Sequence, residues 1–262
     1  MRRRAALLFA GALATTCLVA ACQAPLPESR VPIAADDPLP AALVNGLRDR
    51  SAAIQSIRGV AKLSVDSPEL RFRRPQRFAA LRPDSLRVET LGLFSQVAAI
   101  MVTSGKRYQF FDVSRPEVQE GYVTDDLLAQ VAGINLPPRE LVSVLLGTPG
   151  LAPGTTRRAA ERLSDGGTAV WLRTRSGADR ELEFDALGRL RAYEQKASYG
   201  GSPWGARFAD YREVSGMAFA HKVELRFPSE ASQVTLQFEL VELNPELSPA
   251  VFVLELRRAP AG

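Results

Sequence analysis

Apolar and polar side chains alternate along most of the chain with a period of two, the pattern produced by β-strands with one buried face. The clearest alternating segments are residues 57–66, 85–90, 223–227 and 234–240. Turn signals such as Asp165-Gly166-Gly167 separate successive segments. The pattern predicts roughly eleven strands in an antiparallel sheet.

Residues 97–102 break this pattern, because six consecutive apolar side chains leave this segment without a polar face. A strand that is apolar on both sides must be covered on both sides. We therefore expect a helix to cover the second face, and an apolar cavity between this strand and the helices. The predicted lining residues are Val97, Ala99, Ile100, Met101, Val102, Phe110, Leu141 and Leu145.

Two regions have helical patterns. Leucine and isoleucine recur near helical spacing over residues 39–57, which predicts one amphipathic helix. Within residues 124–147, Thr124 can cap a short helix, Pro138 suits the first turn of a second helix, and Gly147 ends it. We expect an α+β fold that is mainly β: a strongly bent antiparallel sheet that forms an incomplete barrel with a helical lid.

The N-terminus has the pattern of a targeting signal. Arg2, Arg3 and Arg4 precede an apolar run that is short for a membrane span of about 20 residues, so residues 1–21 are typical of a signal peptide. The small residues before Cys22 resemble a bacterial lipobox. That resemblance implies cleavage before Cys22 and acylation of this residue. An ordinary signal peptide with a chance cysteine is the alternative.

The segment after Cys22 contains five prolines and few large apolar side chains up to Pro40. Residues 22–40 are therefore expected to form a lipidated flexible tether, and residues 41–262 the folded domain. Gln23 follows the cysteine. In lipoproteins of this kind, the absence of aspartate at that position implies sorting to the outer membrane.

Charge and composition exclude several classes of function. The net charge is +4, but three of the 33 basic residues precede Cys22, which leaves 30 basic against 29 acidic side chains. This balance gives no sign of nucleic-acid binding. Cys22 is the only cysteine outside the signal peptide, and His221 is the only histidine, expected at a strand end or on the surface. We expect no metal, no cofactor and no enzymatic activity.

Six arginines gather in one region of the predicted sheet. If the strands that carry them are neighbours, their guanidinium groups could meet anionic lipid headgroups. The interpretation that we favour is a solvated sheet face on which Glu69, Asp84 and Glu89 accompany them. The six residues are Arg71, Arg73, Arg74, Arg77, Arg82 and Arg87.

Several short motifs occur in a characteristic order. They are Arg58-Gly59-Val60, Leu91-Gly92, Gly121-Tyr122-Val123-Thr124-Asp125-Asp126, Pro138 to Leu141, and Leu146-Gly147-Thr148-Pro149-Gly150. In order and spacing they resemble the LolA/LolB-like superfamily of lipoprotein carriers and receptors, most of all the LolB-type outer-membrane lipoprotein receptor. The resemblance covers roughly residues 41–245. It implies an incomplete antiparallel barrel whose apolar concavity, under a helical lid, holds acyl chains.

The connection Leu91-Gly92-Leu93-Phe94 joins two predicted strands at the rim of the sheet, where turns normally carry polar groups. We expect this apolar loop to touch the membrane or an incoming acyl chain, with Leu91 exposed. Phe94 has two equal alternatives, exposure or folding back to plug one end of the barrel. Leu91-Gly92 also matches the leucine and glycine of the membrane-inserting loop in LolB-type receptors.

Together these features predict an outer-membrane lipoprotein that faces the periplasm of a bacterial cell envelope. It would bind acyl chains of lipoproteins or phospholipids and help to insert or sort lipoproteins into the outer membrane. The alternative is a structural or assembly lipoprotein that binds a protein partner with the same fold. We expect a monomer whose partners are membrane lipid, through acylated Cys22, and acyl chains, and we keep a periplasmic carrier protein open as a partner.

Overall fold

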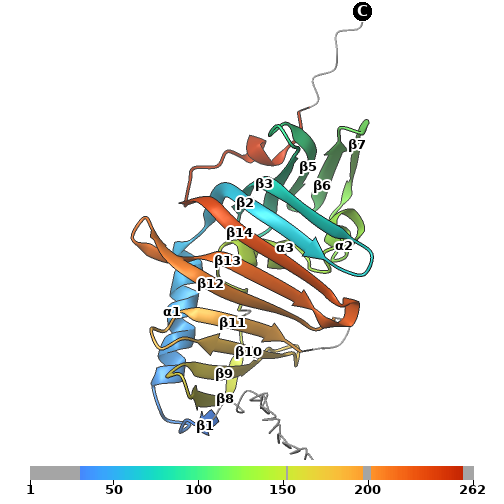
Figure 1. Cartoon of the computed structure of the whole chain (residues 1–262). Coiled ribbons are helices and arrows are strands. Elements are labelled where there is room, and N and C mark those ends of the chain that lie inside the picture. Colours follow the sequence, from blue (N-terminus) through green and yellow to red (C-terminus); the bar gives the residue numbers. More distant parts are fainter. Residues whose placement is uncertain (1–29, 152, 197–201, 256–262) are drawn as a thin grey trace, which may run out of the picture.

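One antiparallel sheet of fourteen strands runs through the part of the chain that the computed structural model describes, residues 30–151, 153–196 and 202–255. Its strand order is β1-β8-β9-β10-β11-β12-β13-β14-β2-β3-β4-β5-β6-β7, and its two edges do not meet. Figure 1 shows that the sheet twists and bends strongly along its length. The predicted class, a mainly β incomplete barrel with a helical lid, is confirmed.

Two meanders make up the sheet. The first contains β2 (Ser56–Asp66), β3 (Arg71–Leu81), β4 (Ser85–Leu91), β5 (Val97–Ser104), β6 (Arg107–Asp112) and β7 (Arg115–Tyr122). The second contains β8 (Thr156–Leu163), β9 (Thr168–Arg173), β10 (Asp179–Phe184), β11 (Leu190–Gln195), β12 (Trp204–Val214), β13 (Met217–Phe227) and β14 (Ser232–Leu243). Strands β14 and β2 join the meanders, with Leu236 opposite Leu63.

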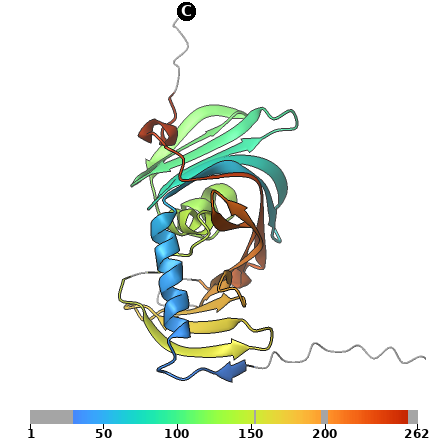
Figure 2. The ribbon, with the colours of Figure 1, turned by 90° about the vertical axis from the view of Figure 1, so that its left-hand side faces the viewer.

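Three α-helices lie against this sheet, α1 (Leu39–Ala53), α2 (Leu127–Ala132) and α3 (Pro138–Leu145). Figure 2 shows the sheet curving around α2 and α3, while α1 runs along the open side of the curve. The 3-10 turns η1 (Pro228–Glu230) and η2 (Pro249–Phe252) complete the elements of the described residues. None of the helices in these ranges has the length and apolar character needed to cross a bilayer.

The predicted helix over residues 39–57 is too long at its C-terminal end. Helix α1 stops at Ala53, and Ser56 already belongs to β2. The side chain of Asn244 fixes this transition, because its Oδ1 accepts a hydrogen bond from the backbone N–H of Gln55 at 2.8 Å. Ile54 and Ile57 are fully buried on either side of it. Ile54 and Ile57 are therefore spaced as in a helix only by chance, because Ile54 follows the end of α1 and Ile57 already lies in β2.

The predicted tether over residues 22–40 is wrong in its second half. Residues 22–29 lie outside the described residues, but Arg30–Pro32 forms strand β1 at the edge of the sheet, paired with β8. The backbone N–H of Ile33 continues this pairing with the carbonyl of Ala160 at 2.9 Å. An edge strand pairs through its backbone and needs few large apolar side chains. The proline-rich composition of this segment therefore did not reveal strand β1. The signal peptide and Cys22 also lie outside the described residues.

Helix α3 begins and ends where the sequence predicts. Pro138 opens it, and Gly147 follows its last turn with φ of 70°. The N–H of Gly147 bonds the carbonyl of Val144 at 2.9 Å and that of Thr148 bonds the carbonyl of Ser143 at 3.1 Å. These two bonds form a Schellman motif, which favours glycine because of its positive φ. The predicted Thr124 cap is wrong, since α2 starts after Asp126 and has no side-chain cap.

A single hydrophobic core links the two meanders. Phe238 of β14 contacts Phe78 of β3 and Phe219 of β13, with ring centroids 5.4 Å apart in both pairs. All three rings are at least 95% buried. Tilted and edge-on aromatic contacts of this kind add to the burial free energy. The β14–β2 junction is therefore packed as the centre of one domain.

Candidate functional site

An apolar cavity of about 340 Å³ lies between the concave face of the first meander and the helices α2 and α3. Strands β2 to β6 and β14 form its floor, and Leu128, Leu141 and Leu145 reach it from the helices. This volume is within the range of about 300 to 1,000 Å³ that ligand sites occupy. The predicted cavity near the strand 97–102 is therefore present.

Five of the eight predicted lining residues face this cavity. They are Ala99, Met101, Phe110, Leu141 and Leu145. Ile100 and Val102 are wrong as lining residues, because side chains of β5 alternate between the two faces of the sheet. Val97 is also absent from the lining, and it lies where the register of β4 and β5 shifts.

The second apolar face of β5 is covered by the C-terminal segment, not by a helix as predicted. Ile100 lines a hollow on that face together with Val251 and Leu254. The segment is held there by two hydrogen bonds: Arg87 donates to the carbonyl of Val251 at 3.0 Å, and the N–H of Leu254 donates to Gln109 at 2.8 Å. The apolar residues near the C-terminus were the available sequence signal for this cover.

Two polar side chains, Gln76 and Thr90, interrupt the otherwise apolar cavity lining. The hydroxyl of Thr90 donates a hydrogen bond to Gln76 Oε1 at 3.0 Å. Gln76 is 3% exposed, and its Nε2 has no hydrogen-bond partner. Neither residue was predicted as part of the site, because a lone glutamine in an alternating strand gives no sign of which face will be buried.

The loop between β4 and β5 presents two of its predicted residues to solvent. Leu93 is 86% exposed and Phe94 is 89% exposed, so Phe94 does not plug the barrel. Leu91 was expected to be exposed, and this is wrong: it is 5% exposed because it still belongs to β4 and pairs with Val97.

A compact turn holds the two exposed side chains of this loop in place. The N–H of Gly92 donates a hydrogen bond to the carbonyl of Gln96 at 2.8 Å, and the N–H of Ser95 donates one to the carbonyl of Gly92 at 3.1 Å. The N–H of Phe94 donates to the side chain of Gln96 at 2.9 Å. A side chain at Gly92 would collide with Gln96, with a Cβ to Nε2 distance of 2.6 Å. These atoms are the far end of an exposed, flexible side chain, so a larger residue at Gly92 would require Gln96 to move and to give up its bond with Phe94.

Arg82 connects the sheet to the helical lid, which consists of α2 and α3, through hydrogen bonds to α3 and to the turn after it. Its guanidinium donates to the carbonyl of Ile54 at 3.0 Å, to the hydroxyl of Ser143 at 3.3 Å, and to the hydroxyl of Thr148. It thus joins the end of α1, helix α3 and the turn that follows α3. Burial lowers the pKa of Arg82 from its ordinary value, which reflects the desolvation of its charge.

The other members of the arginine group divide between paired and unpaired side chains. Arg77 and Arg87 both pair with Glu89, at 3.1 and 2.7 Å. Arg74 is exposed, and its guanidinium stands over the ring of Phe72 at 6.0 Å. Among the described residues Arg74 forms no ion pair. The favoured solvated face therefore holds for Arg77 and Arg87, whereas Arg82 belongs to the lid.

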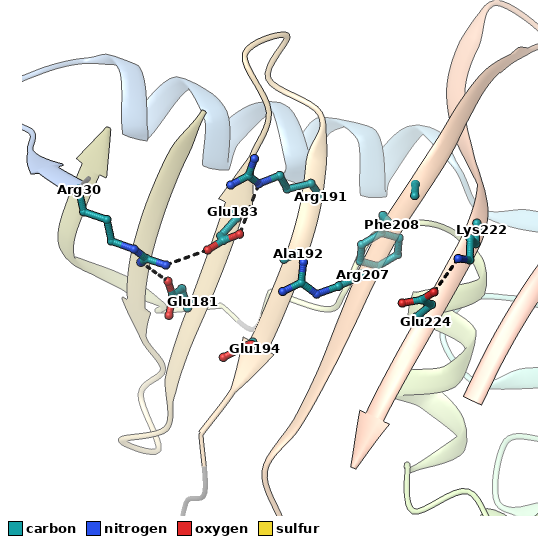
Figure 3. Close-up of a pocket in the computed structure, with 11 residues that line it drawn as sticks. Arg30, Glu181, Glu183, Arg191, Ala192, Glu194, Arg207, Phe208, Lys222 and Glu224 are labelled. Carbon is teal, nitrogen blue, oxygen red and sulfur yellow. Dashed lines mark hydrogen bonds and ion pairs between the residues drawn. The ribbon is translucent and has the colours of Figure 1, made fainter. Parts of the chain in front are cut away.

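The outer face of the second meander carries a different kind of hollow, of about 630 Å³, which Figure 3 shows. Arg30 of β1 donates to Glu181 at 2.8 Å and to Glu183 at 3.1 Å, both on β10. Lys222 and Glu224 pair at 2.7 Å on β13. These opposite charges neutralise one another along the strands, as on a solvated sheet face.

The histidine does not lie at the surface. His221 is 6% exposed within β13, and its Nδ1 lies 3.1 Å from the carbonyl of Phe219. Its ring also contacts the Phe219 ring edge-on, with centroids 5.8 Å apart. Over the described residues, no group of three or more histidine, cysteine, aspartate and glutamate side chains is placed to hold a metal. His221 is therefore part of the core packing.

Comparison with known proteins finds similarity in structure. No protein-family model and no curated protein sequence matches the chain. A domain named as an outer-membrane lipoprotein-sorting protein, from Vibrio parahaemolyticus, superposes with a TM-score of 0.58 at 12% identity, over 80% of this chain and 94% of that one. A LolA superfamily protein from Nitrosomonas europaea gives 0.54 at 11% identity, over 80% and 97%.

A third solved structure, a DUF1329 family protein from Desulfovibrio piger, gives a TM-score of 0.57 at 12% identity, over 83% of this chain and 98% of that one. All three likenesses cover nearly the whole length of the compared protein. The chain therefore has a LolA-like fold. At these identities the comparison shows the fold alone.

Proposed function

We propose that this protein is a lipid-anchored outer-membrane lipoprotein that binds acyl chains of lipoproteins or phospholipids and passes them to the membrane, as a LolB-type receptor does. The apolar cavity between the sheet and the lid helices carries this proposal. A groove of this composition suits hydrocarbon, because burial of apolar surface supplies about 25 cal/mol per Å². The LolA-like fold, which this chain shares with a domain named for lipoprotein sorting and with a protein named for the LolA superfamily, supports the same conclusion.

The anchored arrangement fits this role. Acylation of Cys22 would attach the domain to the outer membrane, and the exposed pair Leu93 and Phe94 would make contact with the bilayer. In this proposal the protein is a monomer and not an enzyme, since it binds and moves its cargo without chemical change. A periplasmic carrier protein would supply the cargo.

The proposal is tested by measuring which lipid co-purifies with the protein. Membrane-extracted full-length protein is predicted to co-purify with acylated lipid, measured by mass spectrometry against a mock purification. Ala99→Phe places a ring in the cavity and is expected to reduce that lipid several-fold while leaving the melting temperature within a few degrees. Ala209→Phe is the matched control, because Ala209 is exposed on the outer face of β12.

Equal lipid content in the wild type and in Ala99→Phe would contradict the proposal. Absence of lipid from every preparation, combined with capture of one defined envelope protein, would favour the alternative of an assembly lipoprotein. The two results separate cleanly because the Ala99→Phe change lies inside the cavity and alters no outer surface.

A further inference from the structure

The cavity wall contains one hydrogen-bond donor that the protein leaves unused. Gln76 Nε2 is buried without a partner, although Gln76 Oε1 accepts from Thr90 at 3.0 Å. An unpaired buried donor costs about 1 to 3 kcal/mol, so such groups are rare in folded proteins. Its position in the lining of an apolar cavity indicates that the missing acceptor belongs to a ligand.

The surroundings of Gln76 place it in the floor of the cavity, where its Nε2 is closed off from solvent. The strand register places Ala61 of β2 beside Gln76, then Thr90 of β4, then Ala99 of β5, in one row across the floor. All four residues line the cavity. The side chains of the two alanines carry no polar atom that could accept a hydrogen bond from Nε2. The Thr90 hydroxyl binds Oε1 and thereby directs Nε2 away from itself.

From Arg74 inward, polarity falls along β3, while the apolar Phe72 lies on the same face nearer the hairpin. Arg74 is exposed, Gln76 is 3% exposed, and Phe78 is 5% exposed. Side chains on one face of a strand are spaced by about 7 Å, so the three positions are separate steps. An acyl ester has the same order, with a polar headgroup, a carbonyl acceptor and a hydrocarbon chain. The order Arg74, Gln76, Phe78 along β3 therefore matches an ester-linked acyl chain and not a bare hydrocarbon.

We propose that Gln76 Nε2 donates a hydrogen bond to the ester carbonyl of a bound acyl chain, so that the chain runs inward past Phe78 and the headgroup stays near Arg74. This inference rests on the proposed function and adds the ligand class, an ester-linked acyl lipid, and the direction in which it binds. Gln76 is then a specificity-determining residue of the cavity.

The test compares two lipids that differ in one oxygen. Palmitoyl lysophosphatidylglycerol is an ester, and hexadecyl lysophosphatidylglycerol is the matching ether without the carbonyl. Each competes with a fluorescent fatty-acyl probe for the full-length protein, below the micelle concentration. The wild type is expected to bind the ester roughly three- to ten-fold more tightly, the value of one net hydrogen bond.

Gln76→Met keeps the length of the side chain and removes the donor. It is expected to bind both lipids equally, with the ether affinity kept, and its fold should persist because removal of the unpaired Nε2 offsets the loss of the Oε1 acceptor for Thr90. Gln76→Leu is a second variant for the same measurement. Gln233→Leu is the control: Gln233 is exposed on β14, and the ester preference should remain.

Three results would overturn the inference. The first is equal binding of both lipids by the wild type, and the second is an ester preference that survives in Gln76→Met. The third comes from hexadecanol, an alcohol that can donate a hydrogen bond, as an added competitor. If hexadecanol binds more tightly than the ester, the amide presents an acceptor to the cavity. In each of these cases a lipid still binds, so the proposed function stands. If neither lipid nor alcohol displaces the probe from any variant, the proposed function itself fails.

Discussion

At the scale of single residues, the lid depends on Arg82. Its three donors reach two segments that are distant in sequence, one at Ile54 and the other at Ser143 and Thr148. Hydrogen bonds from a charged donor are worth more than neutral ones, and the carbonyl of Ile54 is buried with its residue. The charge of Arg82 thus stabilises the contact between the lid and the sheet, despite the cost of its desolvation.

Replacing Arg82 by methionine keeps the apolar stem and removes the donors. We expect the free energy of unfolding to fall by about 2 kcal/mol, measured by urea denaturation. Arg74→Met is the matched control, since Arg74 is exposed and, among the described residues, its one hydrogen bond goes to the carbonyl of Arg73. That control should change stability by no more than about 0.5 kcal/mol. Similar losses in both variants would show that Arg82 has no special role in the lid.

A second partly buried charged group, Glu140, lies where α3 meets the second meander. Burial raises the pKa of the Glu140 carboxyl, and the positive charges of Arg180 and Arg139 oppose that rise. Arg180 donates to the carbonyl of Gly150, next to the same helix. Glu140 was not singled out by its sequence position, because one carboxylate in a helical turn is normally solvated.

At the scale of elements, the β4–β5 loop is the clearest exposed apolar feature. Leaving Leu93 and Phe94 in water forfeits about 1.5 to 3 kcal/mol for each side chain compared with full burial. Antiparallel pairing places the β6–β7 turn at the same end of the sheet, where Val113 is 54% exposed. The two turns therefore bring three exposed apolar side chains, Leu93, Phe94 and Val113, to the same end of the sheet.

The double variant Leu93→Glu with Phe94→Glu is expected to fold normally, because both side chains are already in solvent. We predict that it captures acyl cargo as well as the wild type and delivers several-fold less of it to liposomes. Leu187→Glu is the control: Leu187 is 77% exposed, but in the β10–β11 turn. Undiminished delivery by the double variant would remove this loop from the mechanism.

Element boundaries show what local patterns determine and what they leave open. The ends of α3 are predicted well, because proline and glycine act within a few residues of themselves. The end of α1 and the burial of Leu91 are not, since they depend on Asn244 and on pairing with Val97. Strand β1 is held by its pairing with β8, which starts more than a hundred residues later.

At the scale of the whole molecule, the sheet joins the two meanders through β14 and β2, and the helices between them fill its concave side. Strand β1 ties the start of the described chain to the far edge of the sheet. A domain attached through Cys22 would therefore be joined to its anchor by a segment of at most seven intervening residues, from Gln23 to Ser29. That is a shorter connection than the sequence predicted.

Replacing Cys22 by serine tests the anchor. The thiol is the acceptor for lipid transfer in the lipobox that this segment resembles, so the variant should accumulate as an uncleaved or misprocessed precursor. Incorporation of a labelled fatty acid is expected to fall to background. Alkaline extraction of membranes measures the retained fraction. Normal labelling and normal retention of the serine variant would show that Cys22 is not the lipidated residue.

The sequence by itself determined the mainly β class, the turns and the apolar character of β5, because each follows from side chains within a few residues of one another. It could not decide which face of β5 lines the cavity, or that residues 249–254 cover the other face. It also offered no reason to single out Gln76. These features depend on contacts between distant segments, and alternation marks two faces of a strand without saying what will cover either one.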